Sequence, residues 1–262
     1  MTAKHPAALC AAAAALLVAA CAPGHRRHPY FHKEEQPHAA AWGYEGAGAP
    51  ARWGDLSPEF HLAKDGREQS PVDIRAAAPA PLPPLRFDYR PVPIRLVYNG
   101  HSVQENEDGG SYLGVDGERY KLEQFHFHSP SEHTVDGRSF AMELHFVHKG
   151  VDGEVAVVSV LIDEGAHNAA FDSMWRDLPD RADPRQRSRT RIEVADLLPV
   201  DRRYYAYRGS FTTPPCTEGV RWFVMRQPVS LSAAQIATFR EVIYGNNRPV
   251  QPLNGRAIST SR

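Results

Sequence analysis

Three histidines lie within eight residues in the segment EQFHFHSPSEH. Successive side chains of a β-strand point to opposite faces, and His126 and His128 here alternate with phenylalanines. The alternation predicts a strand with Gln124, His126 and His128 on one face, and Phe125 and Phe127 on the other. If the phenylalanines enter a core, the two imidazoles lie side by side in a cavity.

A third histidine occupies a second strand-like segment, AMELHFVHKG, in which Glu143, His145 and Val147 share one face. If the two strands are neighbours, His145 joins His126 and His128. Three neutral imidazoles at one point form a site for a divalent metal with one coordination position left open. Buried histidines are more often hydrogen-bonded core residues, and an H-x-H pair arises by chance in strands. The third histidine on a matched strand favours the metal site.

Two polar residues fit the metal interpretation. A metal-bound histidine needs a partner for its other ring nitrogen, which fixes the tautomer and the ring orientation. Gln124 shares a face with His126, and Glu143 shares a face with His145. Because a buried polar side chain is costly without a partner, we expect both residues to orient ligands.

The elements that position these residues are mainly strands. The 262 residues are 42% hydrophobic and 23% charged, and they include 19 Gly and 22 Pro. Val, Tyr and Phe recur in short runs bounded by turn residues. The predicted fold class is mainly β (α+β), a large, mostly antiparallel twisted sheet with a few peripheral helices in a single domain. The formal net charge of −1 provides no basic field, so we expect no nucleic-acid partner.

Four segments are predicted as strands, 90–100, 114–128, 139–150 and 154–163, and two as helices, 169–178 and 232–244. Ser232 is the expected N-cap of the second helix. Five arginines follow the first helix and are expected in a solvated surface loop rather than in an anion-binding patch: Arg181, Arg185, Arg187, Arg189 and Arg191.

The N-terminus is predicted to be a targeting segment. Residues 1–21 contain a basic start and an apolar run that ends in VAAC at Cys21, as in a bacterial lipobox. An ordinary signal peptide with an incidental Cys21 is the alternative. Residues 22–41 are expected to be a flexible linker whose histidines are solvated, although they could gather a metal. The domain then spans 42–262. These features predict a periplasmic or cell-envelope lipoprotein of a bacterium that contacts the membrane only through a lipid anchor.

Several blocks together resemble the α-class carbonic anhydrases, in their bacterial form. They are WGYEG, EQSPVDI, YNGHS, QFHFHSPSEH, ELHFVH, GSFTTPPCTEGVRWFV and NNRPVQPL, and they occur in family order from Trp42 nearly to Arg262. The resemblance implies Zn²⁺ held by His126, His128 and His145. It implies zinc-hydroxide-catalysed reversible hydration of carbon dioxide to bicarbonate and a proton.

The resemblance also implies roles for other residues. Thr212 would accept a hydrogen bond from the hydroxide and direct its own proton to Glu132 as a hydrogen-bond donor, and its backbone N–H would hold a substrate oxygen. His101 matches the proton shuttle, and an ordinary surface turn histidine is the less favoured alternative. The remaining matches are the carbon dioxide wall of Val147, Val157, Phe211, Val220 and Trp222, Thr213 near bicarbonate, and a water path lined by Tyr44, Asn99 and Gln104.

Two positions depart from the family pattern. Ala63 stands where many bacterial relatives have the cysteine that bridges to the position of Cys216, so Cys216 is either free or paired between chains. Phe211 stands where the family usually has leucine, and its ring could crowd the carbon dioxide site. The alternative functions are a non-catalytic binding module of the same fold and a periplasmic zinc-binding protein.

Overall fold

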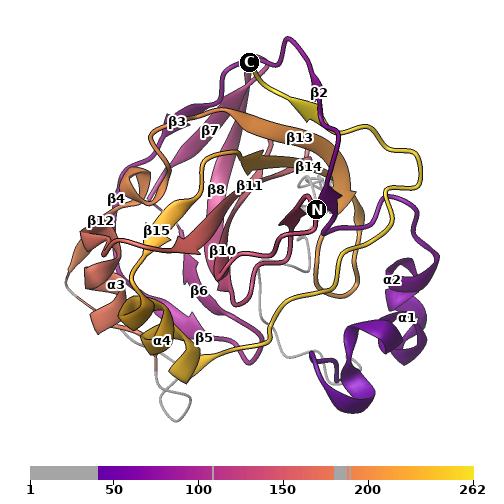
Figure 1. The fold of residues 1–262 in the computed structure, drawn as a ribbon, viewed down its shortest axis with the longest axis horizontal. Helices are drawn as coiled ribbons and strands as arrows, with labels where there is room; N and C mark the ends of the chain where they lie inside the picture. The colour runs from indigo at the N-terminus through magenta and orange to yellow at the C-terminus, as the bar shows by residue number, and fades with distance from the viewer. Residues whose placement is uncertain (1–40, 108, 180–187, 189) are drawn as a thin grey trace, which may run out of the picture. The chain divides into compact units, whose positions relative to one another are not determined.

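The computed structural model describes residues 41–107, 109–179, 188 and 190–262. Its centre is a twisted mixed sheet of twelve strands, whose main path runs β2-β16-β13-β14-β11-β10-β8-β6-β5 (Figure 1). Strands β15, β3 and β7 join this sheet off the main path, and two small two-stranded sheets, β1-β9 and β12-β4, complete the strand pairing. The predicted fold class is confirmed.

The strands are, in chain order, β1 (Asp73–Ile74), β2 (Ala78–Pro79), β3 (Arg86–Asp88), β4 (Pro91–Pro93), β5 (Leu96–Tyr98), β6 (Val103–Asn106), β7 (Tyr112–Val115), β8 (Glu118–His128), β9 (Thr134–Val135), β10 (Met142–Lys149), β11 (Val155–Glu164), β12 (Arg191–Glu193), β13 (Tyr204–Ser210), β14 (Glu218–Met225), β15 (Val229–Leu231) and β16 (Ser259–Thr260). The α-helices are α1 (Trp53–Leu56), α2 (Leu62–Asp65), α3 (Asp172–Arg176) and α4 (Ala233–Val242). The 3₁₀ helices are η1 (Gly46–Gly48), η2 (Pro50–Arg52), η3 (Pro58–Phe60), η4 (Ala169–Phe171) and η5 (Val194–Leu197).

Four central strands set the register of the site. β8 and β10 are antiparallel, and His126 lies opposite His145. β10 is antiparallel to β11, so that His145 also lies opposite Ser159. β11 is parallel to β14, which places Val157 opposite Trp222. Because side chains alternate along each strand, this register collects one face of four strands around His145.

The other face of the same strands is the hydrophobic core. Phe125 and Phe127 are fully buried there, as the alternation predicts. The ring of Phe127 packs against Trp175 of α3 and Phe239 of α4, with centroid distances of 5.4 and 5.6 Å. Burying each phenylalanine contributes about 1.5–3 kcal/mol. These contacts fix the strand, so that its histidines must face the opposite side.

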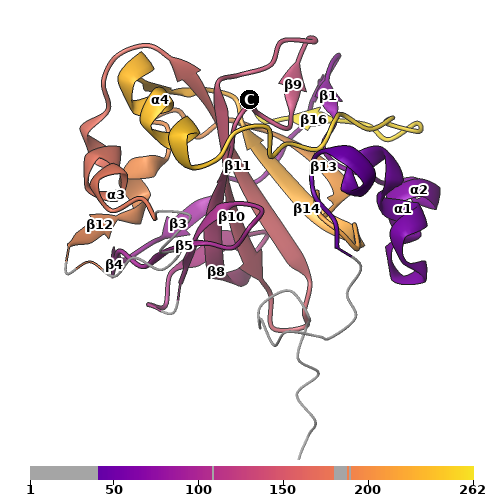
Figure 2. The ribbon, with the colours of Figure 1, turned by 90° about the horizontal axis from the view of Figure 1, so that it is seen from below.

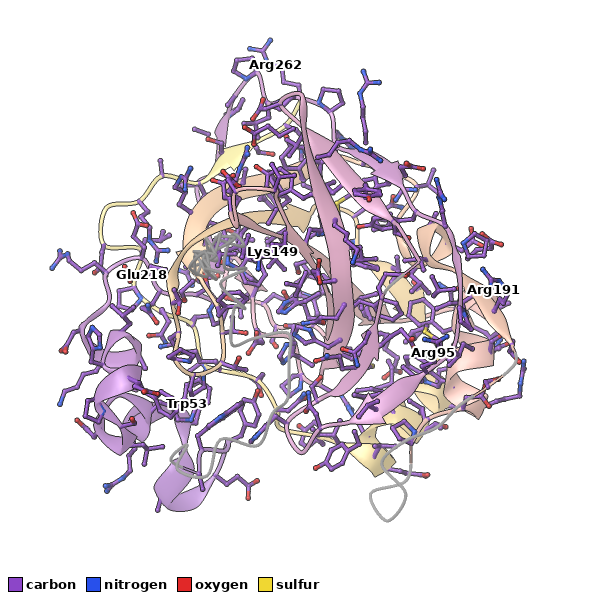
Figure 3. The ribbon with its side chains drawn as sticks, turned by 180° about the vertical axis from the view of Figure 1, so that it is seen from behind. Trp53, Arg95, Lys149, Arg191, Glu218 and Arg262 are labelled. Carbon is purple, nitrogen blue, oxygen red and sulfur yellow. The ribbon has the colours of Figure 1, made fainter. Side chains whose placement is uncertain are left out.

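The helices flank the sheet on two sides. Figures 1 and 2 both place α3 and α4 together on one side and α1 and α2 on the other. α4 begins with the expected capping box, in which Ser232 and Gln235 bond each other's backbone N–H groups. Trp53 of α1 is fully buried, and its Nε1 donates to the carbonyls of Gly43 and Gly48 at 2.9 and 2.8 Å. Figure 3 shows Trp53 and Glu218 on this N-terminal side of the molecule.

Three element predictions need correction. The segment 114–128 is broken by a two-residue turn at Asp116 and Gly117, whose φ values of 56° and 82° reverse the chain into the β7–β8 hairpin. The segment 90–100 is split because β4 pairs with β12 and β5 pairs with β6. The segment 169–178 is a 3₁₀ turn followed by the short helix α3.

Several N-terminal and loop predictions lie outside the described residues. They are the signal segment with Cys21, nearly all of the linker, and Arg181, Arg185, Arg187 and Arg189. Arg191 is described, and it begins strand β12 instead of lying in a loop. Among the residues that the structure describes, no helix has the length and apolar character needed to cross a membrane.

Candidate metal centre

The three predicted ligands converge. His126 and His128 of β8 and His145 of β10 each offer a ring nitrogen, and these three atoms lie within 4.8 Å of one another. The ring centroids are separated by 4.9, 5.2 and 4.7 Å. His128 and His145 are each 1% exposed, and His126 is partly exposed. The cluster therefore has one accessible side, which suits a metal site with an open position.

Each imidazole is held by its other nitrogen, which leaves one nitrogen free for a metal. His126 Nδ1 lies 2.8 Å from Gln124 Oε1, and His145 Nε2 lies 2.8 Å from Glu143 Oε1, as the shared strand faces predict. His128 Nδ1 lies 2.7 Å from the carbonyl of Asn246, a partner that the sequence did not indicate. His128 Nε2 is buried and has no hydrogen-bond partner among the described residues. A buried nitrogen of this kind, aimed at two other imidazoles, fits a metal ligand.

The side chain of Glu143 accepts five hydrogen bonds next to the cluster. Its Oε1 lies 2.6 Å from His133 Nδ1, 2.8 Å from His145 Nε2 and 2.5 Å from Ser159 Oγ. Its Oε2 accepts the backbone N–H groups of Glu132 and His133 at 2.8 and 2.7 Å. Burial alone would raise the pKa of Glu143, but the two histidines hold it well below its usual range. The side chain is therefore a carboxylate that accepts every one of these bonds.

Because a carboxylate can only accept, the ring protons of both histidines are fixed. His145 carries its proton on Nε2, so Nδ1 presents a lone pair to the cluster. His133 carries its proton on Nδ1, so its Nε2 accepts from Tyr207 Oη at 2.6 Å. The Tyr207 oxygen in turn accepts from Ser70 Oγ at 2.9 Å. Sequence reasoning missed His133, Tyr207 and Ser70, since these distant segments of the chain meet only in the folded protein.

His133, Glu143 and His145 also form a group of close potential ligand atoms. In this second group, however, the facing atoms are already joined by the hydrogen bonds at 2.6 and 2.8 Å. A metal there would have to displace both protons. The first cluster presents lone pairs, so it is the better metal site.

Burial disfavours protonation of the three cluster histidines. It is the main cause of the lowered pKa of His126, which the neighbouring His128 and His145 lower further. Burial likewise lowers the pKa of His128 and His145, although Glu143 partly opposes this for both. Neutral imidazoles are the form that binds a metal, so the site is poised for binding near neutral pH.

Glu132 lies beside the cluster. Its Oε1 accepts the backbone N–H of Arg248 at 2.8 Å, and its Oε2 lies 3.5 Å from His128 Nε2 and 4.0 Å from His145 Nδ1. Within the described residues, Oε2 has no hydrogen bond of normal geometry. Burial raises the pKa of Glu132 to about 7. Interactions with His145, with the Arg248 N–H and, most weakly, a side-chain hydrogen bond from Thr212 act in the opposite direction and lower it. Glu132 and Thr212 are therefore neighbours, as expected.

Most residues of the predicted carbon dioxide wall lie on adjacent strands, on the same face of the sheet as the histidines. Val147 lies opposite Val157, and Val157 lies opposite Trp222. Val147, Val157, Val220 and Trp222 are all buried. Trp222 is also fixed by a 3.0 Å hydrogen bond from Nε1 to the carbonyl of Ser210, and its ring packs 4.9 Å from that of His145. Phe211 and Thr213, in the loop after β13, are half-buried.

The predicted proton-path residues cluster near the N-terminal segment. The ring of His101 stacks on Trp42, with centroids 3.7 Å apart and planes 10° apart. Asn99 Oδ1 accepts the backbone N–H of His101 at 2.9 Å, and Asn99 Nδ2 donates to Gln104 Oε1 at 3.3 Å. The hydroxyl of Tyr44 is buried without a partner among the described residues, and burial raises its pKa well above the ordinary value.

Cys216 is the free cysteine of the described region, and it is fully buried. Burial raises the pKa of its thiol to about 11, so the thiolate is scarce at neutral pH. A disulfide to another chain would require this loop to open.

Ala63 occupies the position at which many bacterial relatives were expected to have the second cysteine. Its carbonyl accepts a hydrogen bond from Arg248 Nη2 at 3.1 Å.

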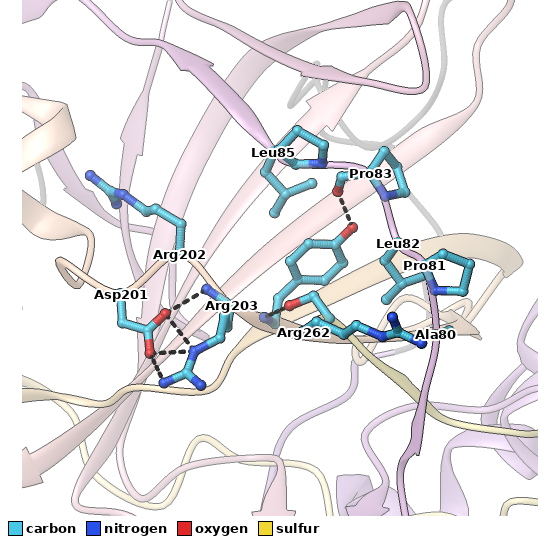
Figure 4. A pocket seen from close by; sticks show the side chains of 12 residues that line it. Ala80, Pro81, Leu82, Pro83, Leu85, Asp201, Arg202, Arg203 and Arg262 are labelled. Carbon is cyan, nitrogen blue, oxygen red and sulfur yellow. Dashed lines mark hydrogen bonds and ion pairs between the residues drawn. The ribbon is translucent and has the colours of Figure 1, made fainter.

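A pocket of about 400 Å³ lies elsewhere on the molecule, between a proline-rich segment at 80–84 and residues 201–204 (Figure 4). Tyr204 Oη donates to the carbonyl of Pro83 across it at 2.6 Å, and Arg203 pairs with Asp201. None of the three cluster histidines lines this pocket. This pocket is therefore separate from the histidine cluster.

Comparison with known proteins identifies relatives along the described domain. Residues 48–262 match the eukaryotic-type carbonic anhydrase family. A carbonic anhydrase of Pectobacterium carotovorum is 46% identical over 218 residues, covering 83% of this chain and 89% of that protein. One of Klebsiella pneumoniae is 43% identical over 223 residues, covering 84% and 91%. The α-carbonic anhydrase of Thermovibrio ammonificans, solved with the inhibitor sulfanilamide, aligns with a TM-score of 0.82 at 44% identity, covering 86% of this chain and all of that one.

Proposed function

Because this chain belongs to the eukaryotic-type carbonic anhydrase family of enzymes, which hydrate carbon dioxide, we propose that it uses zinc held by His126, His128 and His145. The observation that supports zinc best is the convergence of three neutral ring nitrogens, two on buried imidazoles and one on the partly exposed His126, each on a ring whose other nitrogen is already bonded. Zinc favours such a set of imidazoles with one open position. Carbonic anhydrases are the standard example of what the metal supplies, since bound zinc lowers the pKa of water to about 7.

The residues around the histidines have separate tasks in this proposal. Glu132 keeps an oxygen free beside Thr212, so it can accept a hydrogen bond from the Thr212 hydroxyl, which leaves the Thr212 oxygen as an acceptor. An acceptor at this point orients the attacking water toward carbon dioxide. The backbone N–H of Thr212 holds a substrate oxygen as charge develops on it, and Thr213 lies beside bicarbonate.

The apolar wall holds a substrate that offers little to hydrogen bonds. In this proposal the buried side chains of Val147, Val157, Val220 and Trp222 exclude water from the space beside the metal ligands, and the half-buried Phe211 is expected to close part of that space. Carbon dioxide is linear and nonpolar, so such a wall binds it without competing for the metal position.

His101 is proposed to carry the product proton to buffer, along a path lined by Tyr44, Asn99 and Gln104. The ring stacks on Trp42 in the structure. An imidazole is suited to this task because its ordinary pKa is near neutral.

We also propose export and anchoring through the lipobox, with acylation of Cys21. Only the sequence supports this step, through the apolar run that ends in VAAC. Cell fractionation of the wild type and of Cys21→Ser tests it: the wild type is expected in the membrane fraction and the variant outside it. Equal distribution would contradict the anchor.

The alternatives from other classes are less well supported. A non-catalytic binding module does not need three converging imidazoles. A zinc carrier does not need a carboxylate with a pKa near 7 beside Thr212.

Replacement of His145 by alanine tests the proposed function. His145→Ala is expected to lose zinc and carbon dioxide hydration together, because two imidazoles hold the ion far more weakly than three. His167→Ala is the matched control, since His167 is an exposed histidine that also pairs with a carboxylate, Asp172. Full zinc content and normal hydration in His145→Ala would refute the assignment.

A further inference from the structure

Ser159 makes a contact that the proposed function has not yet used. It lies on β11 directly opposite His145, and its side chain is fully buried. Its Oγ is 2.5 Å from Glu143 Oε1. Because Glu143 is a carboxylate, the serine hydroxyl must be the donor.

Three donors therefore compete for one oxygen. Ser159 Oγ, His133 Nδ1 and His145 Nε2 approach Glu143 Oε1 at 2.5, 2.6 and 2.8 Å. An oxygen of a carboxylate offers about two lone pairs, and the other oxygen is already occupied by two backbone N–H groups. The bond from His145, the proposed metal ligand, is the longest of the three.

We propose that Ser159 is a positioning residue for His145 that acts through Glu143: by sharing Oε1, its hydroxyl limits how strongly the carboxylate polarises this metal ligand. A stronger bond from His145 Nε2–H to the carboxylate makes Nδ1 a better electron donor. The serine withdraws charge from the same oxygen and so weakens this effect. This inference rests on the proposed zinc site.

The orientation of Glu143 does not depend on Ser159. Without the serine hydroxyl, the carboxylate keeps four donors, two from the backbone and two from imidazoles. Ser159→Ala removes one oxygen, leaves no buried polar group unsatisfied, and creates almost no cavity. The variant is therefore expected to fold, and any change at the metal is electronic in origin.

Zinc affinity measured by competition with a chelator tests the proposal. Ser159→Ala is expected to bind zinc about three- to tenfold more tightly, below the 10–100-fold by which partners bonded directly to ligands change affinity. The pH midpoint of the visible spectrum of the cobalt-loaded protein is expected to rise, since a better-donating His145 leaves the metal less acidic.

The matched control is Ser111→Ala. Ser111 is also fully buried, but its hydroxyl accepts the backbone N–H of Arg90, away from the histidines. It should lower stability and leave zinc affinity and the cobalt spectrum unchanged. An unchanged or weaker zinc affinity in folded Ser159→Ala would overturn the proposal. Failure of the wild type to bind one equivalent of zinc would instead overturn the zinc site itself.

Discussion

Replacing Glu143 by glutamine removes the centre of the buried network and is expected to cost both stability and metal affinity. One end of an amide donates where the carboxylate only accepts. In one orientation the amide NH₂ faces the backbone N–H groups of Glu132 and His133, and in the other it faces His133, His145 and Ser159. At least two buried donors then lose their acceptor in either case.

The magnitude follows from those lost bonds. Leaving a buried donor unsatisfied costs about 1–3 kcal/mol, so two of them lower the unfolding free energy by about 2–6 kcal/mol. In the second orientation the amide also donates to His145 Nε2, which moves the ring proton to Nδ1, the atom that the metal needs. Zinc affinity is therefore expected to fall by at least the 10–100-fold that is typical for the partner of a ligand.

Urea unfolding of the zinc-free protein and chelator competition for zinc measure the two effects separately. Glu118→Gln makes the same chemical change at a carboxylate that is 64% exposed, and it should alter neither quantity appreciably. If Glu143→Gln keeps its zinc affinity within twofold and its unfolding free energy within about 0.5 kcal/mol, the hydrogen-bond directions assigned here are wrong.

Three further changes probe other parts of the site. His101→Ala should lower maximal turnover on the order of tenfold in dilute buffer, and added imidazole should restore it, because it carries the proton in place of the side chain; indifference to both would show another proton route. Phe211→Leu should raise kcat/KM for hydration at unchanged zinc affinity, since ~1 Å of misplacement can cost about 100-fold; a lower Tm without a kinetic gain would show that Phe211 is a packing residue. Burial lowers the pKa of His148 to about 3, so between pH 6.5 and 3 this side chain is protonated in the unfolded chain but not in the folded one. The unfolding free energy of the zinc-free protein should therefore fall by up to ~1.4 kcal/mol for each unit by which the pH is lowered through this range. His148→Gln, which keeps an acceptor for Tyr89, should flatten that slope in urea unfolding at several pH values, and an unchanged slope would contradict it.

The convergence of the three histidines and two of their hydrogen-bond partners was predictable because strand alternation is local. His126, His128 and Gln124 share a face by spacing alone, and the match with the face of Glu143 and His145 needed only that β8 and β10 be neighbours. Burial of Phe125 and Phe127, which alternate with the histidines, supplied the driving force that fixes which face of the strand enters the core.

Contacts between distant segments were not predictable from spacing. The carbonyl of Asn246 reaches His128 from 118 residues away, and a backbone acceptor carries no signature in its side chain. Ser159 required the β10–β11 register, which the hairpin length left open. The break at Asp116 and Gly117 was missed because the apolar alternation continues on both sides of the turn.

The most direct test of the account is carbon dioxide hydration by the purified protein in a stopped-flow instrument, with zinc quantified in the same sample. Rapid hydration is expected at one zinc per chain, with loss on removal of zinc by a chelator and recovery when one equivalent is returned. Hydration that persists in zinc-free protein, or its absence in protein holding one zinc per chain, would contradict the account.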